Sequence, residues 1–354
     1  MEPGLRKPTL AARLSDVAAA TGLSATAVSR HLNGKLALPP DTAARIADAV
    51  ACLAYEPSQR ARRLSLGRSE TVGLIVPDIA NPFFALLADA VERAADARGL
   101  DLLLCATRNE VGRELRALAR LRHDHVDGLL FVTNHADDGS LAQAIGSGPA
   151  IILLDEDVAG VAAPKVFADN AAGGRLAARR LLAAGHRRLA FIGGPRDLLS
   201  GMERHAGFLD EAAQAGAAVV FEHRGPYNAE AGRCAAARLL AMDDPATAVF
   251  AGSDELALGV LHAARAYGAA VPEDLSIIAF DDAGPLHLLD PPLTAVRQPI
   301  AEMGRCGLEA LAARIAGASL PQQPMRLPVE LIERASVTAP RAPRRRSVVR
   351  ASAA

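Results

Sequence analysis

Short apolar runs that alternate with helical patterns dominate residues 70–338 and place the strongest constraint on the fold. Eight such runs, four to six residues each, are too short for buried helices. They are TVGLIV (71–76), DLLLC (101–105), GLLFVT (128–133), AIILL (150–154), LAFIG (189–193), AVVF (218–221), TAVFAG (247–252) and SIIAF (276–280). Runs without polar alternation are typical of buried parallel strands. So many strand–helix units predict an α/β body with two doubly wound parallel-sheet subdomains.

The segment after the first run has a clear helical period. PFFALLADAVERAADARG (82–99) places apolar residues three and four apart, with Gly99 as a stop. The residues on this stripe are Phe84, Leu87, Ala88, Val91 and Ala95.

Residues 10–66 predict a different, all-α unit. LSDVAAAT (14–21) is followed by Gly22, where a helix end favours positive φ, and Ser24 stands at an N-cap position before the next helix. Helix, three-residue turn and helix is the spacing of a helix-turn-helix, and the small Ala18 permits a tight crossing. An ordinary αα-hairpin is the alternative.

A third helix is expected from about Pro40, with Asp41 near its positive end. Val28 and Leu32 share one face of the second helix. The third helix carries an apolar stripe that can close a three-helix core, formed by Ile46, Val50 and Leu53.

The charge is distributed unevenly. Residues 1–68 have a net charge of +5 and residues 339–354 also +5, which leaves −11 for the segment between them in a chain of net charge −1. A basic head on an acidic body favours a polyanionic partner for the head. YEPSQRARRL (55–64) continues the head as a short, basic, poorly amphipathic segment, and SLGRSE (65–70) is typical of a linker.

Together these motifs resemble the lactose-repressor (LacI) family of bacterial transcription regulators. The resemblance rests on DVAAATGLSATAVSRHLNG, then YEPSQRARRL, then VGLIVPDIANPFF, and covers about residues 13–338. It implies an N-terminal all-α three-helix helix-turn-helix domain with a hinge, and an α/β bilobal periplasmic-binding-protein-like effector domain. The expected boundaries are 10–56 for the helix-turn-helix domain, 57–69 for hinge helix and linker, and 70–338 for the effector domain (first subdomain about 70–168 and 298–325, second about 169–297 and 326–338), with a disordered basic tail at 339–354.

The resemblance makes the second helix the recognition helix. Ala25, Thr26 and Arg30 match positions that face base edges, and Ser24 and Ser29 match phosphate contacts. Arginine can bond guanine O6 and N7 together, which contributes about 1–3 kcal/mol of discrimination.

The resemblance also makes residues 55–64 a hinge that orders on DNA. Leu64 matches a leucine wedged into a minor-groove step, and Tyr55 matches a residue that anchors the hinge and contacts the DNA backbone. The DNA-contacting set is completed by Asn33, Ser58 and Ala61.

Three positions of the head depart from the family pattern. Arg13 stands where a threonine often caps the first helix, and Ser15 is the expected substitute. Ala54 replaces the usual Gly or Asn, which costs about 1 kcal/mol if its φ is positive. Ser58 replaces a common hinge asparagine. These departures affect helix capping and the hinge, not the assignment.

Polar and aromatic side chains follow several of the predicted strands. Carboxylates and amides beside rings suit a polyol ligand, because hydroxyls take directed hydrogen bonds and C–H faces take rings. The residues are Asn81, Phe83, Phe84, Asp155, Ser253, Asp254 and Asp281. The resemblance adds Arg204, Tyr227 and Gln298 to this effector-binding set. An aspartate after a strand is also a common helix N-cap, which is the alternative for Asp155 and Asp254.

Two departures bear on the effector. Glu156 stands where sugar-binding relatives often carry arginine, and Ser253 where many carry asparagine. The lost cation and the lost amide change what the cleft can bind, so the effector cannot be transferred from a relative.

Other chemistries find little support. We expect no cofactor and no metal site: the four cysteines are far apart, and His123 and His125, at i and i+2, do not share a helix face. FIGGP (191–195) is interpreted as a tight turn, not a phosphate loop, and no catalytic arrangement has suitable spacing. No run reaches the roughly 18 apolar residues of a membrane span. A cytoplasmic, nucleoid-associated location in a bacterium is expected.

We therefore predict a homodimeric DNA-binding regulator that binds a pseudo-palindromic double-stranded operator. We expect it to be a repressor rather than an activator. A small sugar or polyol in the cleft would control its DNA affinity. The rival interpretations are a transporter's solute-binding protein, which has no use for residues 13–66, and an α/β enzyme, which needs a general base or phosphate loop. The sequence does not distinguish inducer from co-repressor.

Overall fold

The computed structural model describes residues 12–32, 34, 36–55, 69–123, 126–146 and 150–341. The chain divides into two compact units, with the boundary between Glu70 and Thr71. We call the first unit the head and the second the body, and describe each by itself. Of the predicted DNA-contacting residues, Asn33, Ser58, Ala61 and Leu64 lie outside the described residues, as does the predicted tail after residue 341.

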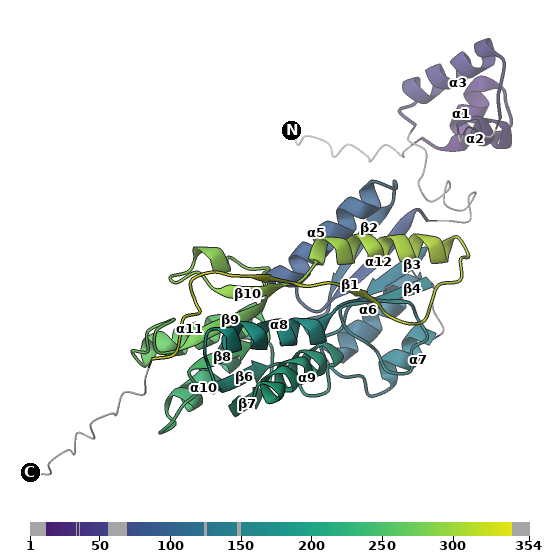
Figure 1. Cartoon of the computed structure of the whole chain (residues 1–354). Helices are drawn as coiled ribbons and strands as arrows, with labels where there is room; N and C mark the ends of the chain where they lie inside the picture. Colours follow the sequence, from purple (N-terminus) through teal and green to yellow (C-terminus); the bar gives the residue numbers. More distant parts are fainter. Residues whose placement is uncertain are drawn as a thin grey trace, which may run out of the picture. The chain divides into compact units, whose positions relative to one another are not determined.

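The head consists of α1 (Leu14–Thr21), α2 (Ala25–Leu32) and α3 (Pro40–Cys52) (Figure 1). Gly22 has φ of +67° and ends α1, and its N–H bonds back to the helix. The Ser24 hydroxyl accepts a hydrogen bond from the Ala27 N–H at 3.2 Å, so it caps α2. The predicted turn between the first two helices is confirmed.

The head core is small. It is built from Val17, Ala18, Val28, Ile46 and Tyr55, all under 10% exposed. Leu53 was predicted to join this core, and that is wrong, because it is 37% exposed; Leu32, on the same face of α2 as the buried Val28, is 36% exposed. Both lie at the ends of their helices, where three short helices no longer cover one another.

The body has two lobes, each a sheet between helix layers (Figure 1). The first lobe has strand order β11-β5-β4-β3-β1-β2. Its strands are β1 (Thr71–Val76), β2 (Asp101–Ala106), β3 (Gly128–Phe131), β4 (Ala150–Leu154), β5 (Lys165–Ala168) and β11 (Met325–Leu327). α5 (Pro82–Asp96) and α12 (Ile300–Ile315) cover one face, and α6 (Val111–His123) and α7 (Ser140–Gly146) the other. The predicted apolar stripe of α5 is buried against this sheet.

The second lobe repeats the plan with strand order β12-β10-β9-β8-β6-β7. Its strands are β6 (Arg188–Gly193), β7 (Ala218–Arg224), β8 (Ala248–Ala251), β9 (Ser276–Asp281), β10 (Thr294–Arg297) and β12 (Glu330–Ile332). α8 (Asn170–Ala183) and α9 (Leu199–Gln214) cover one face, and α10 (Ala229–Leu240) and α11 (Asp254–Ala266) the other. A short 3-10 helix, η1 (Leu286–Leu288), follows β9.

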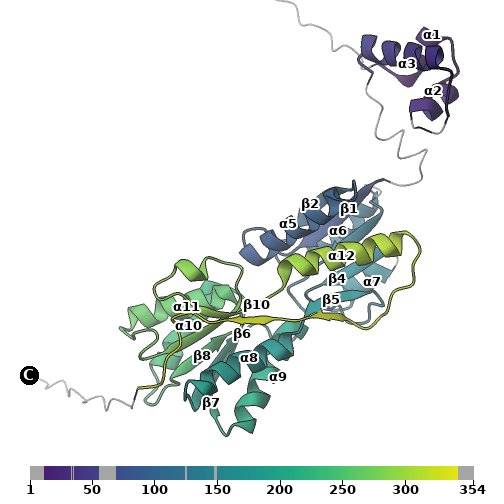
Figure 2. The same cartoon turned by 45° about the horizontal axis from the view of Figure 1, so that its top comes forward.

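The chain crosses between the lobes three times: after β5, after β10 and between β11 and β12. Figure 2 shows the last crossing as the yellow segment that runs from one lobe to the other. We expected this crossing near residue 325, but β11 still pairs with β5 through Leu327, so the chain crosses after that residue. β12 pairs antiparallel with β10, an edge that the parallel prediction missed.

The predicted strands exist, but β2 is not buried as expected. It forms the edge of its sheet, and Leu103 and Leu104 are 39% and 44% exposed. β7, the corresponding edge of the other sheet, is only half-buried. An apolar run indicates a strand but does not say whether a neighbour covers both faces. Among the described residues, no helix is both long and apolar enough to cross a membrane.

Candidate functional site

Helix α2 presents a polar, basic face to solvent. Ser24, Ala25, Thr26 and Arg30 are exposed and Ser29 is half-buried. No acidic residue lies in the first turn of α2, and Arg30 and His31 lie in its last turn. Because Val28 is fully buried, the helix is held by one face while the opposite face remains available to a partner.

The structure shows the effect of two departures from the family pattern in the head, at Ala54 and at Arg13. Ala54 has φ of +45°, the left-handed conformation that favours glycine. The carboxylate of Asp16 accepts a hydrogen bond from the Arg13 N–H at 2.7 Å, so Asp16, not Ser15, serves the start of α1. Tyr55, expected to contact DNA, has its ring in the head core and is 7% exposed.

In the body, five of the predicted effector residues gather where strands end. Asp155 follows β4, Asp281 ends β9, and Gln298 follows β10. Arg204 comes from α9, and Tyr227 precedes α10. The charge of Arg204 acts on the pKa values of Asp155, Asp281 and Tyr227, which places these four groups in one electrostatic cluster. We call these five residues the cleft cluster.

Arg204 is the centre of the cleft cluster and is 4% exposed. Its Nε donates to Asn170 Oδ1 at 2.8 Å, and its Nη1 donates to the Gly252 carbonyl at 2.7 Å and lies 3.6 Å from Asp281 Oδ1. The guanidinium lies 3.8 Å from the centroid of the Phe280 ring. Arg204 is therefore fixed in position, and Asn170 is a positioning residue that the sequence did not reveal.

A close approach of α8 and α9 sets this position. A Cβ on Gly207 would lie 2.1 Å from the Ala171 carbonyl oxygen, and one on Gly174 would lie 2.1 Å from the Arg204 carbonyl oxygen. Only glycine fits at either contact. The Asn170–Arg204 hydrogen bond spans these two helices and depends on that approach.

Gln298 and Asp281 form a second fixed pair. The Gln298 Nε2 donates to Asp281 Oδ1 at 2.8 Å, which orients the amide and leaves Oε1 as its acceptor. That oxygen is buried and has no hydrogen-bond partner within the described part of the chain; the same holds for Asp155 Oδ1 and the Tyr227 hydroxyl. Buried polar atoms without partners are costly, so these three atoms are candidates for contact with a ligand.

Burial changes the acidity of the cleft cluster. It raises the pKa of Asp155 to about 7, against the opposing effect of Arg204. Burial also raises the pKa of Asp281 and of the Tyr227 phenol. The Asp155 carboxyl therefore changes between donor and acceptor near neutral pH.

The other predicted effector residues have bonds within the protein. Asn81 Oδ1 accepts from the Phe83 N–H at 2.9 Å and caps α5, and Ser253 caps α11 through the Leu256 N–H. Asp254 accepts from three backbone N–H groups of residues 282–284, so it holds the loop after β9. Burial and the nearby Asp281 raise the Asp254 pKa to about 7. The rings of Phe83 and Phe84 pack edge to face in the first lobe's core.

Glu156 occupies a place that the sequence did not predict. It belongs to the first lobe but is 3% exposed, because its carboxylate reaches the first turn of α9 in the second lobe. The Leu199 N–H donates to Oε1 at 2.8 Å, and the Ser200 N–H and hydroxyl donate to Oε2 at 3.2 and 2.7 Å. Burial raises its pKa. The available signals were its position directly after β4, beside Asp155, and its departure from the arginine that relatives often carry there.

An ion pair also joins the lobes. Arg326 of β11 makes two hydrogen bonds to the Glu203 carboxylate of α9, at 2.6 and 2.7 Å. The arginine is about one third exposed, so solvent weakens this pair. Together with Glu156, it fastens α9 to the first lobe.

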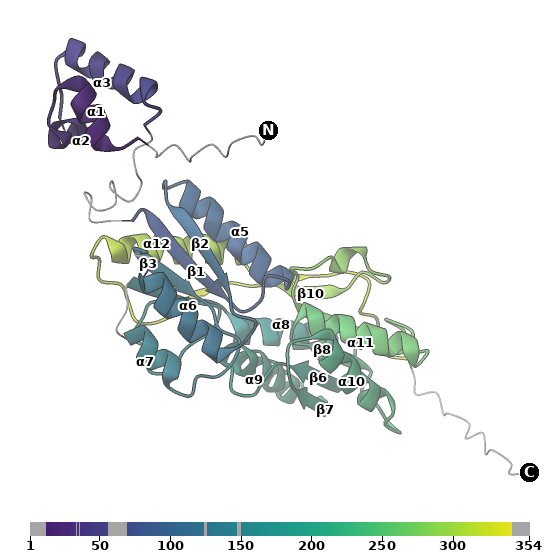
Figure 3. The same ribbon diagram turned by 180° about the vertical axis from the view of Figure 1, so that it is seen from behind.

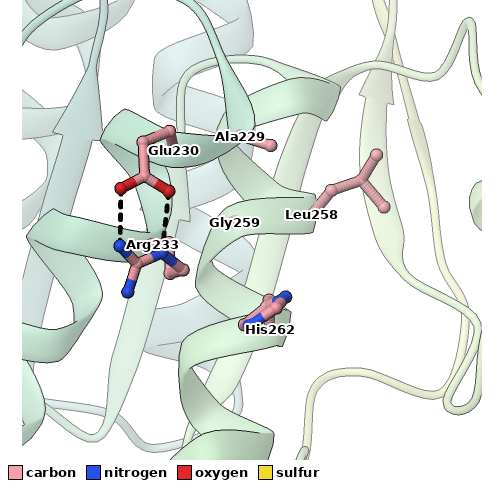
Figure 4. Close-up of a pocket in the computed structure, with 6 residues that line it drawn as sticks. All are labelled: Ala229, Glu230, Arg233, Leu258, Gly259 and His262. Carbon is pink, nitrogen blue, oxygen red and sulfur yellow. Dashed lines mark hydrogen bonds and ion pairs between the residues drawn. The ribbon is translucent and has the colours of Figure 1, made fainter.

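A separate pocket of about 390 Å³ opens between α10 and α11 (Figure 4). Its lining residues are Ala229, Glu230, Arg233, Leu258, Gly259 and His262, none of which belongs to the predicted effector set. Figure 4 shows Glu230 and Arg233 joined by hydrogen bonds on one side of it. Within the described residues, no group of His, Cys, Asp and Glu side chains is arranged to hold a metal ion.

The chain matches two family models. Residues 13–58 match the model described as bacterial regulatory proteins, lacI family, and residues 178–337 match the periplasmic binding protein-like domain.

Curated relatives match nearly end to end. The HTH-type transcriptional regulator DegA of Bacillus subtilis is 33% identical over 91% of this chain and 97% of that protein. The HTH-type transcriptional regulator CelR of Thermobifida fusca is 34% identical over 92% and 96%, respectively.

Solved structures agree with the fold. The lac repressor dimer bound to operator and the anti-inducer ONPF superimposes with a TM-score of 0.84 at 25% identity, over 93% of this chain and 99% of that one. A complex of the regulator CelR with cellobiose gives a TM-score of 0.70 at 32% identity, over 92% and 99%.

Proposed function

We propose that this chain, which belongs to the lacI family of bacterial regulatory proteins, is a transcriptional repressor whose affinity for operator DNA is controlled by a small polar metabolite bound at the cleft cluster. The observation that carries the proposal is that one chain holds both an exposed basic helix after a tight turn and a buried set of polar atoms without partners. The relatives are regulators, and we assign regulation rather than catalysis. This role places the protein in the cytoplasm, at the nucleoid.

The DNA contacts proposed are those of α2. Arg30 would bond a guanine edge, and Ala25 and Thr26 would contribute methyl contacts and one hydroxyl. Ser24 and Ser29, at the start and middle of the same helix, are proposed to contact phosphates. With one long polar side chain facing the bases, we expect part of the discrimination to come from DNA deformability.

The effector contacts proposed are Asp155, Tyr227 and Gln298, which have unpartnered atoms, together with Asp281 and Arg204 of the same cluster. The solved CelR structure holds cellobiose, which supports a polyhydroxyl effector here. Asn81, Phe83, Phe84, Ser253 and Asp254 remain proposals as direct contacts, and their bonds within the protein favour a supporting role.

The proposed control is a two-state equilibrium of the lobes. An effector that binds the two arrangements with different affinity shifts their populations, and DNA must then change effector affinity by the same factor. Because the chain crosses between the lobes three times, the lobes can rotate only about these connections.

A homodimer is proposed, because a pseudo-palindromic operator needs two heads. The edge strand β2 lies beside helix α5 (Figure 3). It exposes Leu103 and Leu104, and Leu86 of α5 is 44% exposed. An apolar sheet edge left in water invites unwanted pairing, so a second copy is the proposed cover. Replacing Leu104 with glutamate should give a monomer in analytical ultracentrifugation, whereas an unchanged dimer would place the interface elsewhere.

The function is tested by selecting DNA sites from a random pool with the purified full-length protein at physiological salt. A palindromic consensus is expected. Arg30→Ala should lose about 1–3 kcal/mol at one base position of each half-site. Arg93→Ala, on the exposed surface of α5, is the matched control and should retain the consensus. No sequence preference over competitor DNA would overturn the regulator assignment, and an unchanged consensus with Arg30→Ala would overturn the role of that residue.

A further inference from the structure

The cleft cluster is surrounded by more negative than positive charge. Arg204 interacts with three carboxylates, those of Asp281, Asp155 and Glu156. Its own charge is directed to protein acceptors, through Nε to Asn170 and through Nη1 towards Asp281. Once these carboxyls are ionised, at a pH above the Asp155 pKa of about 7, an anionic ligand entering this cluster would meet an excess of negative charge in a poorly solvated place.

The first turn of α9 is one place in this cleft where an anionic group would otherwise find donors. α9 has 16 residues, and free N–H groups at a helix N-terminus favour anions. Here Glu156 takes that position: the N–H groups of Leu199 and Ser200 and the Ser200 hydroxyl all donate to its carboxylate. The chain's own anion, brought from the other lobe, thus fills the site.

Two of the three atoms left without partners require donors from a ligand. Asp155 Oδ1 and Gln298 Oε1 are acceptors when the aspartate is ionised, and the Tyr227 hydroxyl can donate or accept. Hydroxyl groups satisfy all three, and an ammonium group suits the carboxylate further. Phosphate or carboxylate oxygens, which only accept, cannot satisfy either acceptor.

We propose that the cleft cluster binds uncharged or amino-bearing polyols and excludes phosphorylated and carboxylated metabolites, and that Glu156 enforces the exclusion. This inference rests on the proposed function, because it names the ligand class of the same site. Glu156 acts by filling the N-terminus of α9 and by adding negative charge next to Asp155.

The test is a thermal-shift and calorimetry panel on the full-length protein at pH 8 and constant ionic strength. The probes are glucose, glucosamine, gluconate and glucose 6-phosphate, with cellobiose, ribose and ribose 5-phosphate. At least one neutral or amino compound should bind, and its phosphorylated or acidic counterpart should bind at least tenfold more weakly. A phosphorylated compound that binds as tightly as its parent, or a panel in which no neutral or amino compound binds, overturns the proposal.

The role of Glu156 has its own readout, with sulfate as the probe. Sulfate should raise the melting temperature of Glu156→Ala more than that of the wild type, relative to chloride at equal ionic strength, because α9 then has free donors. Glu156→Gln, which keeps the shape of the side chain, should reduce the difference in binding affinity between glucose and glucose 6-phosphate. Glu330→Gln and Glu330→Ala, at an exposed residue of β12, are the controls. Equal sulfate shifts in wild type and Glu156→Ala overturn the role of Glu156.

The proposed function and the proposed ligand class can be refuted independently of each other. Site selection on DNA needs no effector, so loss of sequence-specific DNA binding would overturn the proposed function whatever the panel shows. A protein that selects a palindrome yet binds a sugar phosphate tightly keeps the function and loses only the ligand class.

Discussion

Replacing Arg204 with methionine should destabilise the body more than any exposed arginine would. The change removes the charged donors that satisfy Asn170 Oδ1 and the Gly252 carbonyl, and the cation beside Asp281. Hydrogen bonds from a charged donor contribute about 1.5–3 kcal/mol each. Methionine recovers part of the packing against Phe280, so the expected loss in free energy of unfolding is about 3–5 kcal/mol at pH 8, typical of a broken buried pair.

The pH dependence identifies the cause of that loss. Burial raises the pKa of Asp281 and of Asp155 in the folded protein, and Arg204 opposes both shifts. A carboxyl with a raised folded pKa contributes stability at pH values below its unfolded pKa, and this is lost as pH rises through the folded pKa. Without Arg204 both pKa values rise further, so the deficit of Arg204→Met should be smaller at pH 5.5 than at pH 8, by about 1–2 kcal/mol.

Urea unfolding followed by circular dichroism at the two pH values measures this difference. The matched control is Arg93→Met, which removes an exposed pair with Asp89 and should change stability little at either pH. A deficit that does not depend on pH would refute the electrostatic explanation. A deficit below about 1 kcal/mol at pH 8 would show that Arg204 is not the structural centre of the cluster.

Three further predictions concern single positions. Ala54→Gly should stabilise the head by about 1 kcal/mol, because φ there is +45°, and slower hydrogen exchange of head amides would show it; faster exchange would contradict it. Gly207→Ala should cost about 1–3 kcal/mol of stability and weaken effector binding, since its Cβ would meet the Ala171 carbonyl at 2.1 Å; an unchanged melting temperature would argue against that close contact. The hydrogen bond to Glu114 raises the pKa of His135, so its stabilising effect should be complete below the unfolded pKa and disappear as pH rises through the raised folded value. His135→Gln should remove this pH dependence from thermal melts, and a variant that keeps it would assign the dependence to another group.

Local geometry in the head was predictable from the sequence, because it depends on single residues. Gly22 and Ser24 have strong conformational and capping preferences, and the structure gives them those roles. The sequence predicted a cost for alanine at position 54 if its φ is positive, and φ of Ala54 is positive in the structure. Leu53 was misplaced because helical spacing shows which residues share a face, but not where the neighbouring helix ends.

The site was predictable only in part, for a different reason. Strand-following polar residues such as Asp155 and Asp281 could be found from their position, since parallel strands end at one edge. The sequence does not show which carboxylate oxygens accept hydrogen bonds from the protein itself, because the donors lie in loops distant in sequence. The Asp254 carboxylate, for example, accepts from the backbone of residues 282–284. Glu156 shows the limit most clearly, because its partners lie 43 and 44 residues away in the other lobe.

The contacts between the lobes have a free energy of the same order as the free energy that would shift the equilibrium between the two lobe arrangements. Moving a two-state equilibrium from 1:99 to 99:1 takes about 5.5 kcal/mol, and effectors typically contribute about 1–3 kcal/mol of coupling. Three hydrogen bonds between the buried Glu156 and α9, at about 1.5–3 kcal/mol each before desolvation is subtracted, reach that range. The partly exposed Glu203–Arg326 pair adds little, about 1 kcal/mol at most. The equilibrium between lobe arrangements in the absence of effector is therefore expected to depend on Glu156 more than on any other contact between the lobes described here, and a substitution at this residue should change basal DNA affinity even before any ligand is added.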